Sequence, residues 1–183
     1  MDFCRVKRAP KNYRLNGLAR HGYCCALRRY YFGVREHLIF TKNGFISYIV
    51  QVPGHRHDVQ GLYALLKTPF RGHLLGDNAY WPRHDQDPKL IQHGIIMTAQ
   101  TRTGFSFEYE PVFKKELRHT RAHIERRIAM FNKQFNAGST QNRSKYHYMA
   151  RRWCKAAAHN LSRHLNRLLA RPLESCAHFH AVA

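Results

Sequence analysis

The sequence predicts a mixed α/β fold, in which a five-stranded sheet carries helices on its faces and a further helix follows at the C-terminal end. Three observations support this prediction: a strand–turn–strand pattern over residues 30–52, short strands alternating with helices over residues 58–97, and two long helical stretches after residue 111. A hairpin followed by strand–helix alternation is typical of a mixed sheet with helices packed on it.

The first part of the chain supplies a short strand and a hairpin. We expect a strand over residues 1–6 and a long basic loop over residues 7–29, where glycine and proline interrupt any period. Residues 30–40 and 45–52 are rich in aromatic and β-branched side chains, as strands are. Asn43-Gly44 between them is a favoured hairpin turn pair, so these two segments are predicted to pair antiparallel.

Short strands and helices alternate in the middle of the chain. Asp58 occupies the expected N-cap position of a helix that carries leucines at helical spacing. Residues 72–76 form a predicted buried strand, a short helix covers residues 88–92, and residues 95–97 form the last strand. Residues 100–111 are predicted to be an irregular loop.

Two long amphipathic helices follow. In the first, apolar residues recur every three or four positions from Phe113 to Phe135. In the second, from about residue 146 to 170, we expect one apolar face to be buried and the basic side chains to lie largely off it. That face consists of Tyr146, Met149, Trp153, Ala157, Leu161, Leu165 and Leu168.

The chain is strongly basic. Its 183 residues include 31 Lys+Arg and 11 Asp+Glu, a formal net charge of +20, which predicts a polyanionic partner and nucleic acid first. No apolar stretch reaches the ~18–20 residues that cross a bilayer, and the first residues lack a signal peptide's apolar segment. These features exclude secreted, membrane-spanning and collagen-like proteins. Five cysteines without paired zinc spacing favour a reduced, intracellular protein.

Three of the eleven acidic residues stand at positions where chemistry is plausible. Asp2 lies in the first strand, Asp77 follows the strand at 72–76, and Glu125 lies at the edge of the apolar stripe of the first long helix. Two of them have an ordinary alternative: Asp77 as an Asp-Asn turn, and Glu125 as an exposed ion pair with Arg121. Asp2 alone says almost nothing. Together, three carboxylates suit divalent cations, which support in-line displacement at phosphorus.

Three segments carry a resemblance to a known family. They read GYCCALRRYYFGVREHLIFTKNGFISYIVQVPGHRHDVQGLYALL, LLGDNAYW and HTRAHIERRIAMF. Over roughly residues 1–135 the chain resembles the catalytic domain of bacterial insertion-sequence transposases of the DDE class. The resemblance implies an RNase H-like mixed five-stranded sheet with flanking helices, plus a C-terminal helix. It also implies that Asp2, Asp77 and Glu125 are catalytic and bind two Mg²⁺ (or Mn²⁺) ions.

The activity and partners implied by the resemblance are specific. Such enzymes hydrolyse DNA at the element ends and join the freed 3′-hydroxyl to target DNA. The implied partners are double-stranded DNA and a second copy of the chain in a synaptic homodimer, in the bacterial cytoplasm. The implied domains are a catalytic domain at 1–136, a polar linker at 137–144, and a basic helix with a frayed tail at 145–183.

The chain departs from many relatives in several places. Arg118, Asn132 and Asn78 stand where a Tyr, a Lys and a Lys are common. Asp2 follows Met1 directly, whereas these enzymes normally carry a DNA-binding segment before the first Asp, so we expect an N-terminally truncated copy. Two alternative functions stay open: a noncatalytic basic DNA-binding protein, and an RNase H-fold nuclease without strand transfer.

Basic residues near the three carboxylates are predicted to contact DNA phosphates. The N-terminal basic residues are interleaved with four tyrosines that suit base stacking: Tyr13, Tyr23, Tyr30 and Tyr31. The alternative is a flexible basic loop that does not contact DNA. The predicted DNA-binding set is Lys7, Arg8, Arg28, Arg29, Arg121, Arg126 and Arg127.

Other candidates have simpler interpretations. His55-x-His57-Asp58 is more consistent with a helix cap than with a metal cluster. Glu36 is expected to pair with an arginine, and Cys24-Cys25 to be plain thiols. His178-x-His180 is only a weak metal pair.

Overall fold

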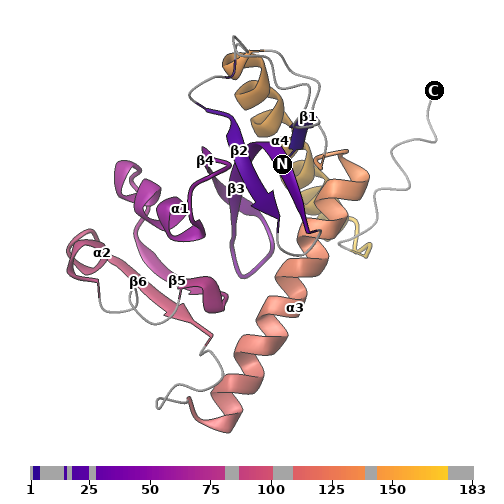
Figure 1. Ribbon diagram of the computed structural model, residues 1–183. Helices are drawn as coiled ribbons and strands as arrows, with labels where there is room; N and C mark the ends of the chain where they lie inside the picture. Colours follow the sequence, from indigo (N-terminus) through magenta and orange to yellow (C-terminus); the bar gives the residue numbers. More distant parts are fainter. Residues whose placement is uncertain are drawn as a thin grey trace. The chain divides into compact units, whose positions relative to one another are not determined.

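The computed structural model describes residues 2–4, 15, 18–24, 28–80, 87–100, 109–138 and 144–172. The chain forms two compact units, whose helices and strands are labelled in Figure 1. Unit 1 comprises Met1–His55 and Arg126–Ala183, and unit 2 comprises Arg56–Glu125.

Unit 1 contains a four-stranded antiparallel sheet organised around one long strand. β1 (Asp2–Cys4), β2 (Arg20–Cys24) and β4 (Ile46–Pro53) each pair antiparallel with β3 (Arg29–Phe40). The predicted hairpin is confirmed: Val34 lies opposite Pro53 and Ile39 lies opposite Tyr48. Its turn has Gly44 at φ +82°, a backbone conformation that glycine adopts without strain.

The prediction of a loop over all of residues 7–29 is wrong, because β2 occupies Arg20–Cys24. Its five residues pair with Arg29–Gly33 of β3, with Tyr23 opposite Tyr30. The strand was missed because Gly22 weakens the strand pattern, yet glycine is required there. A Cβ at Gly22 would overlap the carbonyl oxygen of Gly54, and one at Gly54 would come within 2.6 Å of the Arg20 oxygen. Two backbones therefore approach closely where the sequence shows only a period breaker.

Helix α4 (Lys145–Leu168) has its buried face where the sequence did not predict one. Its predicted apolar face is largely exposed: Tyr146 is 83% exposed, Trp153 47% and Leu161 59%. The buried side chains are instead Tyr148, Arg152, Ala156, His159, Arg163 and Asn166. The helix itself is confirmed, but the prediction of its core face is wrong.

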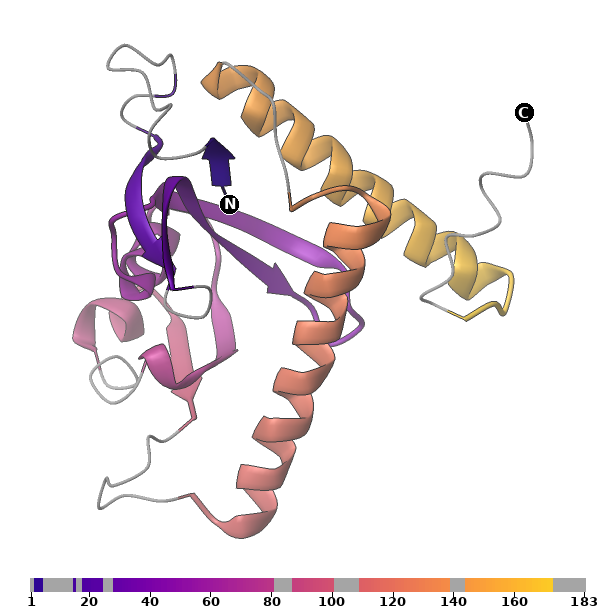
Figure 2. The ribbon, with the colours of Figure 1, turned by 45° about the vertical axis from the view of Figure 1, so that its right-hand side comes forward.

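Specific polar contacts explain which face of α4 is buried. Figure 2 shows the backbone of α4 as the orange-to-yellow helix. Arg152 forms a buried ion pair with Glu36 of β3, and its Nη1 donates to the Ala137 carbonyl at 2.6 Å. Tyr148 donates its hydroxyl to the same Glu36 carboxylate at 3.3 Å. Burial and the Glu36 charge raise the pKa of Tyr148. The prediction that Glu36 pairs with an arginine is confirmed.

Three further side chains of α4 bind the backbone of the β3–β4 hairpin. Asn160 accepts the Ile46 N–H at 2.8 Å and donates to the Ile46 carbonyl at 2.9 Å, so one amide satisfies both backbone groups. Arg163 Nε donates to the Asn43 carbonyl at 2.7 Å. His159 Nε2 lies 3.2 Å from the Gly44 carbonyl, and burial lowers the pKa of this imidazole. Because an unpaired buried polar group costs free energy, these contacts orient the helix.

Unit 2 is built on a two-stranded parallel ladder. β5 (Gly72–Gly76) pairs with β6 (Ile95–Ala99) in the register Gly72 to Ile95 and Gly76 to Ala99. α1 (Asp58–Ala64), with the short helix η2 (Leu65–Lys67), precedes β5. Between the strands lie the short helix η3 (Asn78–Tyr80) and α2 (Pro88–Gln92), and Gly94 at φ +81° ends the α2 segment as predicted.

The mixed α/β class is confirmed, and two details are corrected. The described strands form a four-stranded antiparallel sheet and a two-stranded parallel sheet, rather than the single predicted five-stranded sheet. The N-cap of α1 is His57, without a side-chain cap hydrogen bond, and Asp58 is the first residue of the helix. Among the described residues, no helix is long and apolar enough to cross a membrane.

Helix α3 (Pro111–Gln134) confirms the predicted apolar stripe. Leu117 and Phe131 are buried, with 5% and 0% exposure, and Ile124 and Ile128 are half-buried. The helix contributes residues 111–125 to unit 2 and residues 126–134 to unit 1. In unit 1, Phe131 packs with Ile46, Ala137 and Ala156 in one apolar cluster.

Candidate active site

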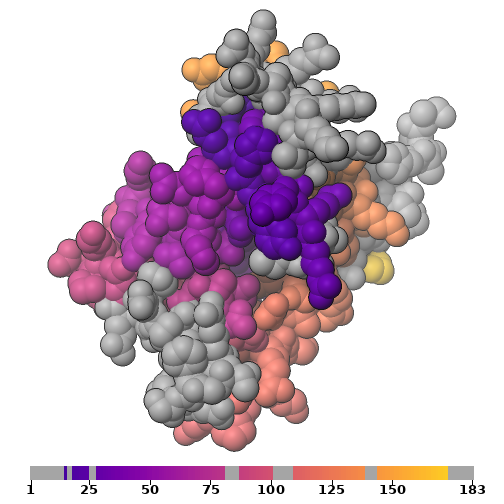
Figure 3. Space-filling model, viewed as in Figure 1, coloured from indigo at the N-terminus to yellow at the C-terminus, as the bar shows by residue number. Residues whose placement is uncertain are grey.

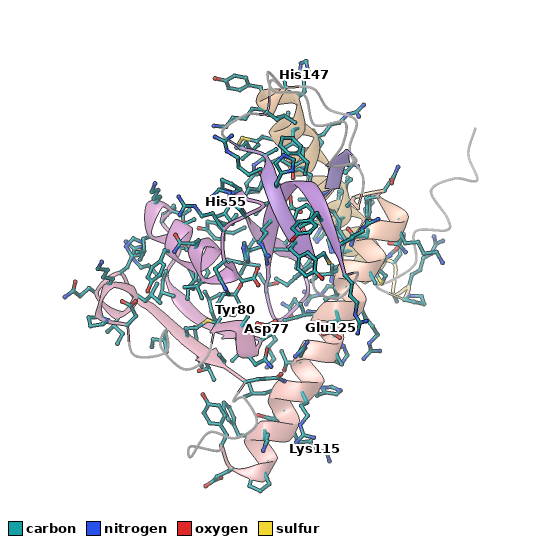
Figure 4. All side chains as sticks on the ribbon, viewed as in Figure 1. His55, Asp77, Tyr80, Lys115, Glu125 and His147 are labelled. Carbon is teal, nitrogen blue, oxygen red and sulfur yellow. The ribbon has the colours of Figure 1, made fainter. Side chains whose placement is uncertain are left out.

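Asp77 follows directly after the last residue of β5, as the sequence predicts (Figure 4). Its Oδ1 accepts the Ala79 N–H at 2.9 Å, and its backbone carbonyl accepts the Tyr80 N–H at 3.2 Å. The Asp-Asn turn is therefore real. Within the described part of the chain, no partner is recorded for the second carboxylate oxygen, Oδ2, so the turn holds the side chain by one oxygen.

The residue before Asp77 is Gly76, and the packing around it leaves little room for a side chain. A Cβ there would overlap the end of the Met97 side chain and come within 2.9 Å of Tyr80 Cδ2. Gly76 thus lets β6 and the η3 turn pack against the backbone immediately before Asp77. The Gly-Asp-Asn-Ala-Tyr segment is a compact turn at the carboxyl end of a parallel strand, where α/β proteins commonly place ligands.

Glu125 lies on α3 and forms the ion pair that the spacing predicts. Arg121 Nε donates to Glu125 Oε1 at 2.8 Å, with the two side chains 45% and 61% exposed. An exposed i,i+4 pair of this kind is worth only ~0.3–0.5 kcal/mol. Its main consequence is positional, since the guanidinium restricts where the carboxylate of Glu125 lies.

A chain of hydrogen bonds within unit 2 connects the two acidic positions. The Gln100 N–H donates to the Gly76 carbonyl at 3.3 Å, next to Asp77. Arg121 Nη1 donates to Gln100 Oε1 at 3.1 Å, and the same guanidinium holds Glu125. Gln100 was not predicted as a site residue. Its place directly after β6, beside the carboxyl end of β5, is the signal that identifies it.

Asp2 belongs to the other unit. It lies in β1 opposite Gly33 of β3, which confirms the predicted strand, but its side chain is outside the described part of the structure. Among the described residues, no three His, Cys, Asp or Glu side chains form a metal-binding group. The three predicted carboxylates therefore remain a hypothesis about one site.

The predicted DNA-binding residues have different environments. Arg28, Arg29 and Arg126 are exposed, and Arg127 Nη2 donates to the Lys42 carbonyl at 3.4 Å. Lys7, Arg8 and Tyr13 lie outside the described residues. Arg152 and Arg163, on the predicted basic face of the last helix, are buried.

The interleaved tyrosines divide into two groups. Tyr31 is 8% exposed and donates its hydroxyl to the Gly54 carbonyl at 3.0 Å, so its predicted role in base stacking is wrong. Tyr23 and Tyr30 are 41% and 68% exposed. Of the three tyrosines of this set that the structure describes, exposure agrees with the stacking prediction for Tyr23 and Tyr30.

The remaining candidates that the structure describes are either exposed to solvent or have a structural role. His55 and His57 are exposed, and Cys24 and Cys154 are free thiols. Asp87 caps α2 by accepting the Lys89 N–H at 2.9 Å. It also accepts the hydroxyl of Tyr63, and this hydrogen bond raises the pKa of that tyrosine. His178 and His180 lie outside the described residues.

Comparison with known proteins identifies the family. Residues 1–145 match the family model described as a transposase DDE domain. The match spans most of the chain, so the protein belongs to the DDE transposase domain family. Searches of curated proteins and of solved structures return no match for the chain. Membership of the family indicates a DNA partner and a function in DNA transposition, and such domains generally use divalent metal ions.

Proposed function

We propose that the chain is the catalytic domain of an insertion-sequence transposase, and that it cleaves DNA and transfers the 3′-hydroxyl strand in a metal-dependent reaction. Asp2, Asp77 and Glu125 are the proposed catalytic and metal-binding residues. The observation that carries the proposal is the hydrogen-bond chain from Gly76 through Gln100 and Arg121 to Glu125. It links the two acidic positions within one unit, although they are 48 residues apart (125 − 77).

The chemistry of the donors suits hard cations such as Mg²⁺ or Mn²⁺. Carboxylate oxygens are the ligands these ions prefer, and two ions bound between them supply charge stabilisation for in-line displacement at phosphorus. In this proposal Asp77 Oδ1 accepts the Ala79 N–H, and Oδ2 is the oxygen that binds a metal ion. Likewise Glu125 Oε1 accepts from Arg121, and Oε2 is the oxygen that binds a metal ion. In this proposal Arg121 fixes Glu125 and adds positive charge near the DNA phosphate.

The order of strands also supports an RNase H-like topology as part of the proposal. Three strands that pair antiparallel around β3 precede a parallel strand–helix–strand segment in sequence. The acidic residues then come from the first strand, the end of β5 and the long helix α3. Arg28, Arg29, Arg126 and Arg127 are the proposed phosphate contacts, together with Lys7 and Arg8.

Cleavage of DNA by charge-only variants tests the proposal. We expect the wild type to nick supercoiled plasmid in Mg²⁺ and Asp77→Asn and Glu125→Gln to lose at least ~100-fold in rate, since even outer-shell partners of metal ligands cost ~10–100-fold. Glu116→Gln is the matched control, because Glu116 is also an exposed acid of α3. It is expected to retain wild-type activity.

The same assay distinguishes the alternatives. Salt-sensitive DNA binding without cleavage, unchanged in both variants, would show a noncatalytic DNA-binding protein. Cleavage without joining of an added 3′-hydroxyl donor oligonucleotide would show a nuclease. The synaptic homodimer is also a proposal, and light scattering with and without element-end DNA measures it.

A further inference from the structure

Two exposed tyrosines lie side by side on unit 1. Tyr23 of β2 and Tyr30 of β3 are directly opposite each other in the antiparallel register. Their ring centroids are 5.0 Å apart with a tilt of 58°, and the side chains are 41% and 68% exposed. The indigo part of the chain, to which β2 and the start of β3 belong, reaches the molecular surface in Figure 3.

The aromatic surface continues along the same face of the two strands. Successive side chains alternate between faces, so His21 and Phe32 share the face of Tyr23 and Tyr30. The His21 and Phe32 rings are in contact, edge to face, at 5.1 Å. Phe32 is buried and anchors the row, whereas His21 is exposed. Three of the four rings in this row, Tyr23, Tyr30 and His21, are therefore exposed to solvent, and the two tyrosines are neighbours.

The surrounding charge selects the ligand. Residues 20–35 contain four arginines (Arg20, Arg28, Arg29 and Arg35) and no Asp or Glu. By the same alternation Arg20, Arg29 and Arg35 start on the opposite face of the two strands, and Arg35 donates to the Gly54 and Tyr23 carbonyls, whereas Arg28 precedes the first residue of β3. Arg28 and Arg29 immediately precede Tyr30 and are exposed. Exposed aromatic rings close to arginines suit single-stranded nucleic acid, because the rings can stack on its unpaired bases while the arginines contact its phosphates. Duplex DNA offers the phosphates but keeps its bases stacked inside.

We propose that Tyr23 and Tyr30 form a stacking platform for unpaired bases of single-stranded DNA, with Arg28 contacting the adjoining phosphates. This inference rests on the proposed DNA function, because it names the form of DNA that this surface binds. Stacking on an aromatic side chain is worth ~1–3 kcal/mol per base. Tyr30 is the more exposed of the two, at 68% against 41% for Tyr23.

Fluorescence anisotropy with labelled oligothymidine and with a labelled duplex, in EDTA, tests the platform. We expect Tyr30→Ile and Tyr23→Ala/Tyr30→Ile to weaken single-strand binding by about 5- to 100-fold. Isoleucine keeps the strand propensity and removes the ring. Duplex binding is expected to stay within about twofold, and Tyr30→Trp to retain single-strand binding.

Two controls make the result decisive. Tyr146→Ala removes another exposed tyrosine of unit 1 and is expected to bind both DNAs as the wild type does. Arg28→Ala is expected to weaken both DNAs. Unchanged single-strand binding by folded Tyr30→Ile protein, or equal losses on both DNAs, would overturn the platform. EDTA removes cleavage from the measurement, so the platform and the catalytic proposal succeed or fail separately.

Discussion

Helices α3 and α4 are both 24 residues long, yet they are positioned by different forces. The buried side chains of α3 are apolar, and they are the ones that its hydrophobic period indicates, such as Leu117 and Phe131. The buried face of α4 carries Arg152, His159, Arg163 and Asn166, while Trp153 and Leu161 are exposed. Hydrophobic periodicity therefore located both helices but identified the buried face of only one.

The difference follows from what each helix packs against. The turn of the β3–β4 hairpin offers backbone carbonyls at Asn43 and Gly44, and β3 offers the buried carboxylate of Glu36. Burying these groups without a partner costs more free energy than exposing a few apolar side chains, and exposed apolar side chains are common in proteins. α4 therefore presents its hydrogen-bonding face to the hairpin.

Breaking the buried ion pair is expected to have the largest effect. Arg152→Met leaves the Glu36 carboxylate buried without its cation, which typically costs ~3–5 kcal/mol of unfolding free energy. Urea unfolding followed by circular dichroism measures the loss. The double variant Glu36→Gln/Arg152→Met removes both charges and is expected to recover part of it. A loss below ~1 kcal/mol for Arg152→Met would contradict the polar explanation.

Removing the Asn160 amide is expected to have an intermediate effect. Asn160→Ala leaves the N–H and carbonyl of Ile46 without their side-chain partner, at a cost of ~1–3 kcal/mol. His164→Ala, an exposed position on the same helix, is the control and is expected to be nearly neutral. Equal stabilities of the two variants in urea would show that the hairpin contacts do not orient α4.

Shortening a leucine on the exposed face of α4 is expected to have the smallest effect. Leu161 is 59% exposed, so Leu161→Ala is expected to change the unfolding free energy by less than ~0.5 kcal/mol. Leu117→Ala on α3 is the matched change at a 5% exposed leucine and is expected to cost ~2–5 kcal/mol. Thermal unfolding of both variants measures the contrast, and similar losses would remove the distinction between the helices.

Much of the fold was predictable because its signals are local. Asn43-Gly44, the Gly94 helix end and the α3 stripe depend on turn geometry and helical period, and all are confirmed. β2 was missed because its formation depends on pairing with β3 rather than on its own five residues. The buried face of α4 was wrong because hydrogen-bond partners more than 100 residues away decide it, such as Glu36 for Arg152.

The candidate site shows the same division. Asp77 at the end of a strand and Glu125 paired with Arg121 follow from spacing, and the structure has both features. Gln100, which bridges Gly76 and Arg121, was not predicted, because its role depends on the parallel pairing of β5 with β6. Convergence of Asp2 with the other two carboxylates stays a prediction.

The close approach of Gly22 to Gly54 has a consequence for folding. A strand that slips by one residue exchanges its two faces, and a slipped β2 would place His21 or Tyr23 where only a hydrogen atom fits. Steric overlap with the Gly54 backbone therefore excludes the misaligned pairing, independently of which side chains it would bury or expose. Gly22 fixes the register of β2, and with it the alignment of Tyr23 and Tyr30 across the two strands.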